Sequence, residues 1–163
     1  MITNRPRRLD GVSYVGYQRY FLTTCSALRR SCFTDAAVAN RVIDQFLHNA
    51  ALCDFAVLAY CLMPDHFHAL VEAESEQSDF RMFVKRFKQT TGFIYRQEAK
   101  QRLWQAGYHE RILRDEETTE VVVRYIIENP IRAGLSKALG EYPFAGSAAY
   151  NLDALKTAWE RQT

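Results

Sequence analysis

Two apolar runs, residues 54–63 and 66–73, are separated in the chain only by Pro64 and Asp65. Proline and aspartate favour tight turns, and apolar runs of this length between turn signals favour buried strands. The pattern therefore predicts a β-hairpin, with the first run as a central strand. Any fold of this chain has to be built around that hairpin.

The segment before the hairpin predicts one strand and one helix. Residues 17–26 are β-rich and fit a first strand. Thr34 can cap a helix that runs to about Ala50. Five apolar residues recur on one face of this helix: Val38, Val42, Ile43, Phe46 and Leu47.

The segment after the hairpin predicts a helix, a strand and another helix. Ser78 can cap a long helix, and Gly92 is a point where this helix would kink or divide. Residues 111–113 fit a short strand, and Thr118 can cap a helix that ends or kinks at Pro130. The long helix has an apolar face (Phe80, Phe83, Val84, Phe87) and a basic face (Arg81, Lys85, Lys88).

The resulting order is strand, helix, strand, strand, helix, strand, helix. This order predicts an α+β fold of the ferredoxin-like or RRM-like type, an antiparallel sheet with helices on one face. The 163 residues fit one domain over 1–163, with a core at about 14–135 and a C-terminal tail over 136–163. Because this fold hosts many unrelated functions, the function has to be inferred from the open face of the sheet.

The net charge of +2 conceals an uneven distribution of basic residues. Residues 1–30 contain six arginines against one acidic residue, and residues 79–114 contain nine lysines and arginines against three. Because like charges repel, two basic segments in a near-neutral chain indicate an acidic partner such as nucleic acid. A solvated basic surface is the alternative.

The expected location is the cytoplasm, with nucleoid association. No run of about 18 apolar residues predicts a transmembrane span, and no apolar segment follows the basic N-terminus as a secretory signal would require. The four cysteines form no CxxC pair, which argues against a zinc cage or a disulfide framework. Reduced and mostly buried thiols are expected.

The sharpest local signal is His66-Phe67-His68 at the start of the second hairpin strand. Side chains alternate across a strand, so both imidazoles lie on one face. Phe67, Ala69 and Val71 would pack under the helices on the other face. Two histidines about 7 Å apart along a strand can share one divalent cation. The alternative is a pair of half-exposed strand histidines without a ligand.

Tyr125 and Asn129 are four residues apart on a predicted helix, so they share a face, and Asn129 is a candidate third ligand. A tyrosine hydroxyl, whose ordinary pKa is near 10, can attack phosphorus beside a cation and form a covalent phosphotyrosine. The alternative for Tyr125 is a core aromatic. Tyr95 is the rival nucleophile, but its i+4 partner is Ala99, which cannot bind metal.

Two other residues bear on the site. His109, in the loop between the basic helix and the Tyr125 helix, could contact DNA or support the site, and a solvated loop histidine is the alternative. Glu72 shares the strand face of the two histidines, where we expect it to be a surface carboxylate.

Three runs of sequence resemble segments of one known family. Residues 63–71 (MPDHFHALV) resemble the HUH box, histidine–bulky apolar–histidine, of single-tyrosine transposases. Residues 125–135 (YIIENPIRAGL) resemble the nucleophile segment of the REP-associated tyrosine transposases, and residues 103–111 (LWQAGYHER) are similar to the W-Q-x-x-Y/F-H-[DE] loop of that branch. The opening residues 6–11 (PRRLDG) are typical of its bacterial members. The resemblance covers about residues 5–150.

The resemblance implies a transposase that cleaves single-stranded DNA beside a hairpin, forms a 5′-phosphotyrosine and rejoins strands without ATP. By motif position, His66 and His68 would hold the metal, Asn129 would be the third ligand and Tyr125 the nucleophile; related enzymes often have glutamine at the Asn129 position. Two imidazoles suit Zn²⁺ or Mn²⁺, whereas the family uses Mg²⁺ or Mn²⁺. Members occur as monomers and as homodimers that swap the tyrosine helix. The expected DNA-binding residues are Arg7, Arg8, Arg81, Lys85, Lys88 and His109.

Two other functions are open to the same residues. One is a non-catalytic protein of the same fold that binds hairpin DNA through its basic helix and N-terminal arginines. The other is a zinc hydrolase that uses the two histidines and Glu72, which the lack of a third strong ligand disfavours.

Overall fold

The computed structural model describes residues 11–114 and 116–162. Arg7 and Arg8, two of the expected DNA contacts, lie outside the described residues. The elements are β1 (Arg19–Cys25), the 3₁₀ turns η1 (Ala27–Arg29) and η2 (Cys32–Thr34), α1 (Ala36–Leu52), β2 (Phe55–Met63), β3 (His66–Ala73), α2 (Phe80–Ala99), β4 (His109–Leu113), α3 (Glu116–Arg132), β5 (Ala145–Gly146) and α4 (Leu152–Glu160).

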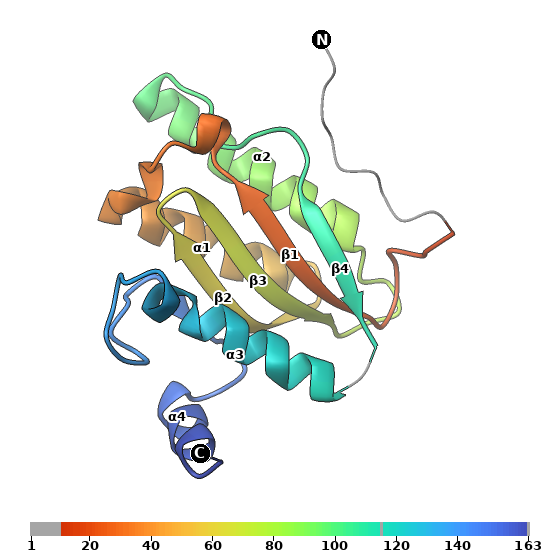
Figure 1. Ribbon diagram of the computed structural model, residues 1–163. Helices are drawn as coiled ribbons and strands as arrows, with labels where there is room; N and C mark the ends of the chain where they lie inside the picture. The colour runs from red at the N-terminus through yellow and green to blue at the C-terminus, as the bar shows by residue number, and fades with distance from the viewer. Residues whose placement is uncertain (1–10, 115, 163) are drawn as a thin grey trace.

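The predicted α+β fold with an antiparallel sheet is confirmed, and the five strands lie in the order β4-β1-β3-β2-β5 (Figure 1). The predicted hairpin is β2 and β3, which pair from Met63 opposite His66 to Phe55 opposite Ala73. β3 also pairs with β1, so its backbone is hydrogen-bonded on both edges. We expected β2 to be a central strand. It is paired on both sides, with β3 and with the short β5, but the strand in the middle of the order is β3.

Helices lie on both faces of the sheet. α1 and α2 pack on one face, where their aromatic residues meet Phe67 of β3. α3 crosses the other face over β2 and β3, and its Ile126 packs in the same cluster as Leu70 of β3 (Figure 1). The face on which we expected the site is therefore partly covered by the tyrosine-bearing helix, and α4 packs beside α3 through Trp159.

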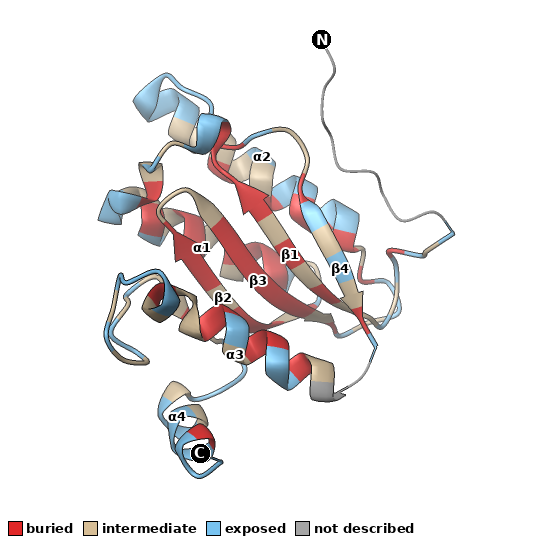
Figure 2. Cartoon of the chain, in the orientation of Figure 1, coloured by how far each residue is buried: buried red, intermediate tan, exposed pale blue. Residues whose placement is uncertain are grey.

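The main core is an aromatic cluster between the sheet and the two helices α1 and α2. The ring of Phe46 in α1 lies 4.7 Å from that of Phe67 and 5.0 Å from that of Phe87, centroid to centroid. The four residues of the predicted apolar face of α2 are buried, and Figure 2 shows buried positions on the sheet and on the helix faces turned toward it. In the described parts of the chain, no helix has the length and apolar character that a membrane span requires.

Two helix caps are shifted by one residue from the prediction. Asp35, not Thr34, caps α1, and its carboxylate accepts from the backbone N–H of Ala37 at 2.9 Å. Asp79, not Ser78, caps α2, while the Ser78 hydroxyl donates to the carbonyl of Asp54 at 2.8 Å. In both places an aspartate follows a hydroxyl residue, and the carboxylate is the charged acceptor that a helix N-terminus favours.

Neither the expected division at Gly92 nor the expected helix end at Pro130 is found. α2 runs without interruption through Gly92. α3 begins at Glu116, before the expected cap Thr118, and continues past Pro130 to Arg132. Gly134 (φ +73°) closes the helix just after Arg132: its N–H donates to the carbonyl of Ile131, and the N–H of Leu135 donates to the carbonyl of Pro130. This pair of bonds is the Schellman motif, which needs a left-handed residue and so selects glycine.

Replacement of Phe46 by alanine tests the aromatic core. The ring is fully buried, and its removal leaves a cavity, so we expect a loss of about 3–5 kcal/mol in the free energy of unfolding. Urea denaturation followed by circular dichroism measures it. His48→Ala, an exposed position on the same helix, should change stability by less than about 0.5 kcal/mol; equal losses would contradict the assignment of this core.

Candidate active site

The strand alternation places His66 and His68 together on the α3 face of the sheet. Their ring centroids are 4.7 Å apart, while Phe67 between them points into the aromatic core on the other face. Leu70, two residues further along β3, packs in the cluster that contains α3. The expected common face for the two imidazoles is therefore confirmed.

Both histidines are held by a hydrogen bond at Nδ1. Asp65 Oδ1 lies 2.6 Å from His66 Nδ1. An ionised carboxylate only accepts, so His66 Nδ1 is the donor, and Nε2 is the ring nitrogen that Asp65 does not use. The Thr23 hydroxyl lies 2.9 Å from His68 Nδ1, which leaves Nε2 of that ring as its remaining nitrogen. Metal-binding histidines are commonly oriented by such a second partner.

Asp65 is anchored from the other side by Arg29, whose Nε donates to Asp65 Oδ2 at 2.9 Å. Burial acts to raise the pKa of the Asp65 carboxyl, but the hydrogen bond from His66 and the charge of Arg29 outweigh it, so the pKa is lowered. Arg29, Asp65 and His66 thus form a chain with an ionised carboxylate at its centre.

His68 is only 8% exposed, and its pKa is lowered to about 4, first by burial and then by the positive charges of His66, Arg132 and Arg29. The protonated form is disfavoured because it would bring a charge into a poorly solvated position. His68 is therefore neutral at physiological pH, which is the form that binds a metal ion.

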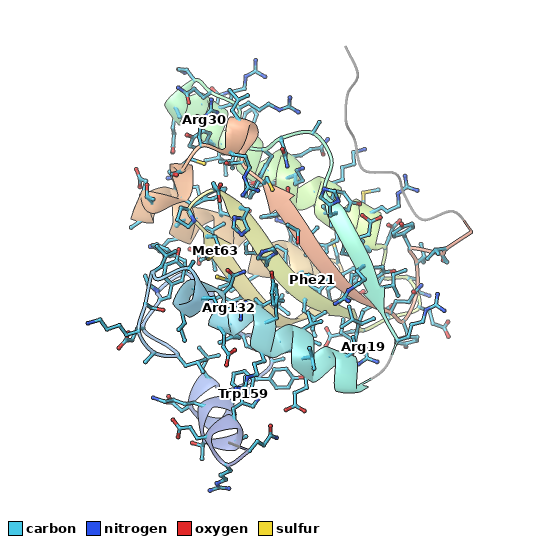
Figure 3. The ribbon with its side chains drawn as sticks, viewed as in Figure 1. Arg19, Phe21, Arg30, Met63, Arg132 and Trp159 are labelled. Carbon is cyan, nitrogen blue, oxygen red and sulfur yellow. The ribbon has the colours of Figure 1, made fainter. Side chains whose placement is uncertain are left out.

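Tyr125 of α3 faces this pair, with its ring centroid 6.0 Å from that of His68 and 6.1 Å from that of Phe21. It is 45% exposed, so it is not a core aromatic. The guanidinium of Arg132 lies 4.4 Å from the centroid of the Tyr125 ring and donates a hydrogen bond to the Tyr125 carbonyl. Figure 3 shows Phe21 and Arg132 on the side of the sheet that α3 crosses.

Asn129 follows Tyr125 by four residues on the same uninterrupted helix, so the two share a face as expected. Tyr95 lies in α2 and packs against the aromatic core on the other side of the sheet. The fold therefore brings His66, His68 and Tyr125 together and leaves Tyr95 away from them.

The donor set fits a divalent cation only in part. Among the described residues no group of three or more His, Cys, Asp or Glu side chains could hold a metal ion. Two imidazoles whose Nε2 atoms are not used by Asp65 or Thr23 supply two ligands. An amide oxygen from Asn129 and oxygen atoms from DNA or water would have to complete the coordination.

The remaining expected DNA contacts lie in different places. Arg81 is exposed on α2 and covers the ring of Tyr14 at 5.6 Å. Lys88 is committed to the fold, because its ammonium donates to the carbonyls of Gln105, at 3.0 Å, and Gly107. His109 is exposed and lies opposite Thr23 on β4, which puts it on the same sheet face as His68, two strands away.

The sequence analysis missed four residues that shape this site: Thr23, Arg29, Asp65 and Arg132. Thr23 and Arg29 come from segments far from the histidines in sequence, so no local pattern could reveal them. Arg132 was detectable, because it lies seven residues after Tyr125 and positions i and i+7 share a helix face. Asp65 was assigned to the turn, although it directly precedes His66.

The fold thus carries a histidine pair on the central strand of an antiparallel sheet, faced by a tyrosine on a helix. The sequence profile of the IS200-like transposases matches residues 15–129, which is more than half of the chain. This protein belongs to the IS200-like transposase family.

Individual relatives agree with this assignment. A Haemophilus influenzae protein named as a REP-associated tyrosine transposase is 22% identical over a 102-residue alignment, and the match covers 56% of this chain and 58% of that protein. The structure of a REP-associated tyrosine transposase bound to a REP hairpin superposes with a TM-score of 0.71 at 20% identity, covering 87% of this chain and 81% of that one. A crystal structure described as a transposase from Deinococcus radiodurans gives 0.51 at 25% identity, over 75% and 97% of the two chains.

The buried imidazole predicts a pH dependence of stability. The pKa of His68 is about 4 in the folded protein and about 6.5 in the unfolded chain. The unfolded chain therefore takes up a proton first, and stability that is complete above pH 6.5 is lost as the pH falls toward 4, by up to roughly 3 kcal/mol.

Urea unfolding between pH 7 and 4, with a chelator present, measures this loss. His68→Gln removes the titrating group, so its stability should fall less over that interval than that of the wild type. His48→Gln, at an exposed position in α1, should follow the wild type. An identical pH profile for wild type and His68→Gln would refute a neutral buried His68.

Proposed function

We propose that this protein is a DNA nickase and strand transferase in which Tyr125 is the nucleophile. The observation that carries the proposal is the placement of Tyr125. Its half-exposed ring lies over the sheet face that carries the two histidines, with its centroid 6.0 Å from that of His68. The proposed substrate is single-stranded DNA beside a hairpin, because one relative was solved with a REP hairpin and α2 is rich in cations.

In the proposed step the hydroxyl oxygen of Tyr125 attacks the scissile phosphorus. The bond between this oxygen and phosphorus forms while the bond from phosphorus to the 3′ oxygen breaks. The phenolic proton passes to solvent, the 3′ oxygen gains a proton, and the products are a 5′-phosphotyrosine and a free 3′-hydroxyl. One phosphoester replaces another, so a second 3′-hydroxyl can reverse the step and join strands without ATP.

His66, His68 and Asn129 are the proposed holders of a divalent cation, Mg²⁺ or Mn²⁺, which when bound would polarise the phosphate as a Lewis acid. Asp65 and Thr23 keep the two imidazoles fixed in orientation, which reduces the reorganisation needed on binding. Arg132 lies against the Tyr125 ring, where its charge suits the negative charge that develops on the phenolic oxygen and on the phosphate.

Two alternatives make different demands on the site. A non-catalytic hairpin-binding protein would not need a nucleophile held beside oriented histidines. A zinc hydrolase would need Glu72 close to them, but Glu72 pairs with Arg19 at 3.6 Å and lies four residues beyond His68 on β3, about 13 Å along the strand. The transesterase accounts for more of the observed arrangement.

Tyr125→Phe tests the nucleophile. The change keeps the ring and its packing, so we expect unchanged stability and a loss of DNA cleavage by roughly three orders of magnitude or more. Hairpin oligonucleotides with their natural flanks, taken from the host genome, are the substrates. With the wild type, the fragment downstream of the cut should migrate with the denatured protein, and peptide mapping should locate the DNA on Tyr125.

Tyr95→Phe is the matched control, because this tyrosine lies on the other side of the sheet, and it should cleave at the normal rate. DNA attached to Tyr95 would refute the assignment of the nucleophile. A free 5′-phosphate without any adduct would indicate water as the nucleophile and ordinary hydrolysis.

His66→Ala and His68→Ala test the metal site. Each should abolish cleavage in Mg²⁺ or Mn²⁺ while DNA binding, measured by fluorescence anisotropy, persists, because the expected phosphate contacts lie elsewhere. Cleavage by the double variant in the presence of a chelator would show that these histidines hold no catalytic cation.

A further inference from the structure

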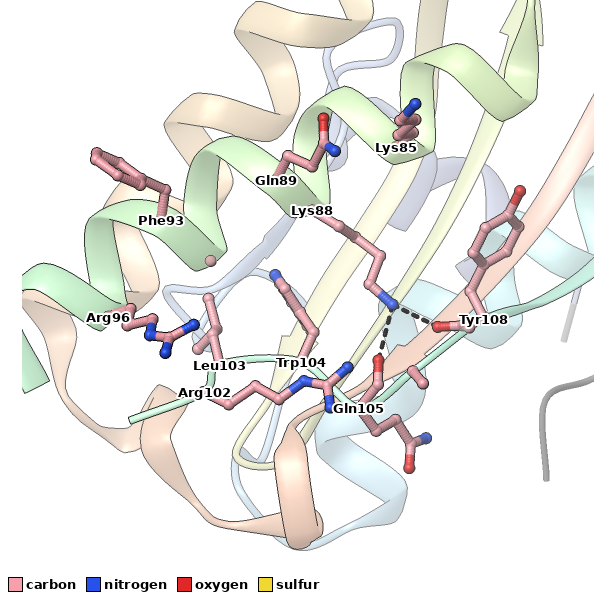
Figure 4. A pocket seen from close by; sticks show the side chains of 13 residues that line it. Lys85, Lys88, Gln89, Phe93, Arg96, Arg102, Leu103, Trp104, Gln105 and Tyr108 are labelled. Carbon is pink, nitrogen blue, oxygen red and sulfur yellow. Dashed lines mark hydrogen bonds between the residues drawn. The ribbon is translucent and has the colours of Figure 1, made fainter. Parts of the chain in front are cut away.

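A hollow lies away from Tyr125, between α2 and the loop of residues 102–108 (Figure 4). Its volume is about 900 Å³, near the upper end of the range for small-molecule sites. Leu103, Trp104 and Tyr108 of this loop belong to the aromatic core, so the hollow lies on the α1–α2 side of the sheet.

The lining of this hollow carries one sign of charge. Lys85, Lys88 and Arg96 of α2 and Arg102 of the loop line it, and no acidic residue is found among the described residues around it. Glu98, the acidic residue within α2, is paired with Arg41 of α1 instead. A concave surface with cations alone concentrates anions.

Lys88 has a structural part in this arrangement. Its ammonium donates to the carbonyls of Gln105 and Gly107, as the dashed lines in Figure 4 mark. These bonds hold the loop at a fixed distance from α2, so the hollow is formed before any ligand arrives. Lys85, Arg96 and Arg102 are exposed and are the cations left to meet a ligand.

The hollow also presents an aromatic ring to solvent. Phe93 lines it from α2 and is 66% exposed, unlike the phenylalanines of α2 that pack in the core. The exposed amide side chains of Gln89 and Gln105 stand on the two sides of the hollow (Figure 4). A phenyl face can stack on a base, amides can bond to base edges, and cations can bind phosphates, which together suit an unpaired nucleotide.

The backbone connects this hollow to the histidine end of the sheet. The N–H of Gln105 donates to the carbonyl of Cys25 at 3.0 Å, and Cys25 is the residue opposite His66 in the pairing of β1 with β3. Neighbouring strands are about 5 Å apart. The loop that bounds the hollow therefore passes the end of the sheet at which His66 lies. A flexible single strand of DNA can continue around that end to the other face of the sheet.

We propose that the hollow between α2 and residues 102–108 binds unpaired nucleotides of the same DNA strand that Tyr125 cuts, with a base against Phe93 and phosphates at Lys85, Arg96 and Arg102. This assignment rests on the proposed function for the identity of the strand. The surface that would bind the DNA strand and the reacting centre then lie on opposite faces of the sheet.

The test measures binding without cleavage, in a Tyr125→Phe background. The probes are a fluorescent oligothymidylate and a blunt DNA duplex of the same length, followed by anisotropy at several salt concentrations. Phe93→Ala should weaken oligothymidylate binding about tenfold. Arg96→Ala and Arg102→Ala should each lower the slope of log affinity against log salt by roughly 0.7. Duplex binding should change much less in all three.

Arg86→Ala is the matched control, because Arg86 is exposed on the same helix but does not line the hollow; it should leave oligothymidylate binding near that of the background protein. All the substituted positions are exposed, and an unchanged melting temperature verifies folding. Unchanged oligothymidylate affinity in Phe93→Ala, or an equal loss for the duplex, would overturn the proposal. A wild type that binds as expected but forms no adduct would instead refute only the role of Tyr125.

Discussion

Backbone pairing of β3 with a neighbour on each edge is the constraint on which both the core and the site depend. The register sets His68 between Thr23 of β1 and Cys61 of β2. A slip of one residue would turn the imidazoles into the aromatic core and expose Phe67 to water, so burial of the core face fixes the register strongly. The orientation of the site is therefore stabilised by residues on the opposite face that never touch it.

The end of α3 determines what surrounds the tyrosine. A helix that stopped at Pro130 would leave Arg132 outside it, whereas α3 continues to Arg132 and is closed by the Schellman motif at Gly134. A cation in the last turn is also favoured by the helix dipole. Arg132, in this last turn, has its guanidinium 4.4 Å from the centroid of the Tyr125 ring.

The sequence was sufficient wherever a local repeat determined the structure. The period-two pattern of 66–73 and the apolar faces of α1 and α2 gave the hairpin, the sheet and most of the core. It was insufficient where two neighbours could serve equally, as Thr34 and Asp35 could at a cap, and where a long side chain meets a distant backbone. Lys88 shows the second case: its spacing on α2 indicated a phosphate contact, but its ammonium is used by a loop more than fifteen residues away.

Charge explains why the proposed site needs a surface elsewhere. His68 is kept neutral by burial, and the charge of Arg29 is shared with Asp65, so of these side chains Arg132 offers the positive charge nearest to Tyr125. Without the proposed divalent cation, these side chains would hold a polyanion weakly in the ground state. In the proposed reaction, cations on α2 would supply binding energy that is the same before and during the reaction, and this energy would position the scissile phosphate against Tyr125. In this proposal the α2 surface supplies affinity and the centre serves the transition state, because a centre that bound phosphate tightly by itself would stabilise the uncut strand as much as the transition state.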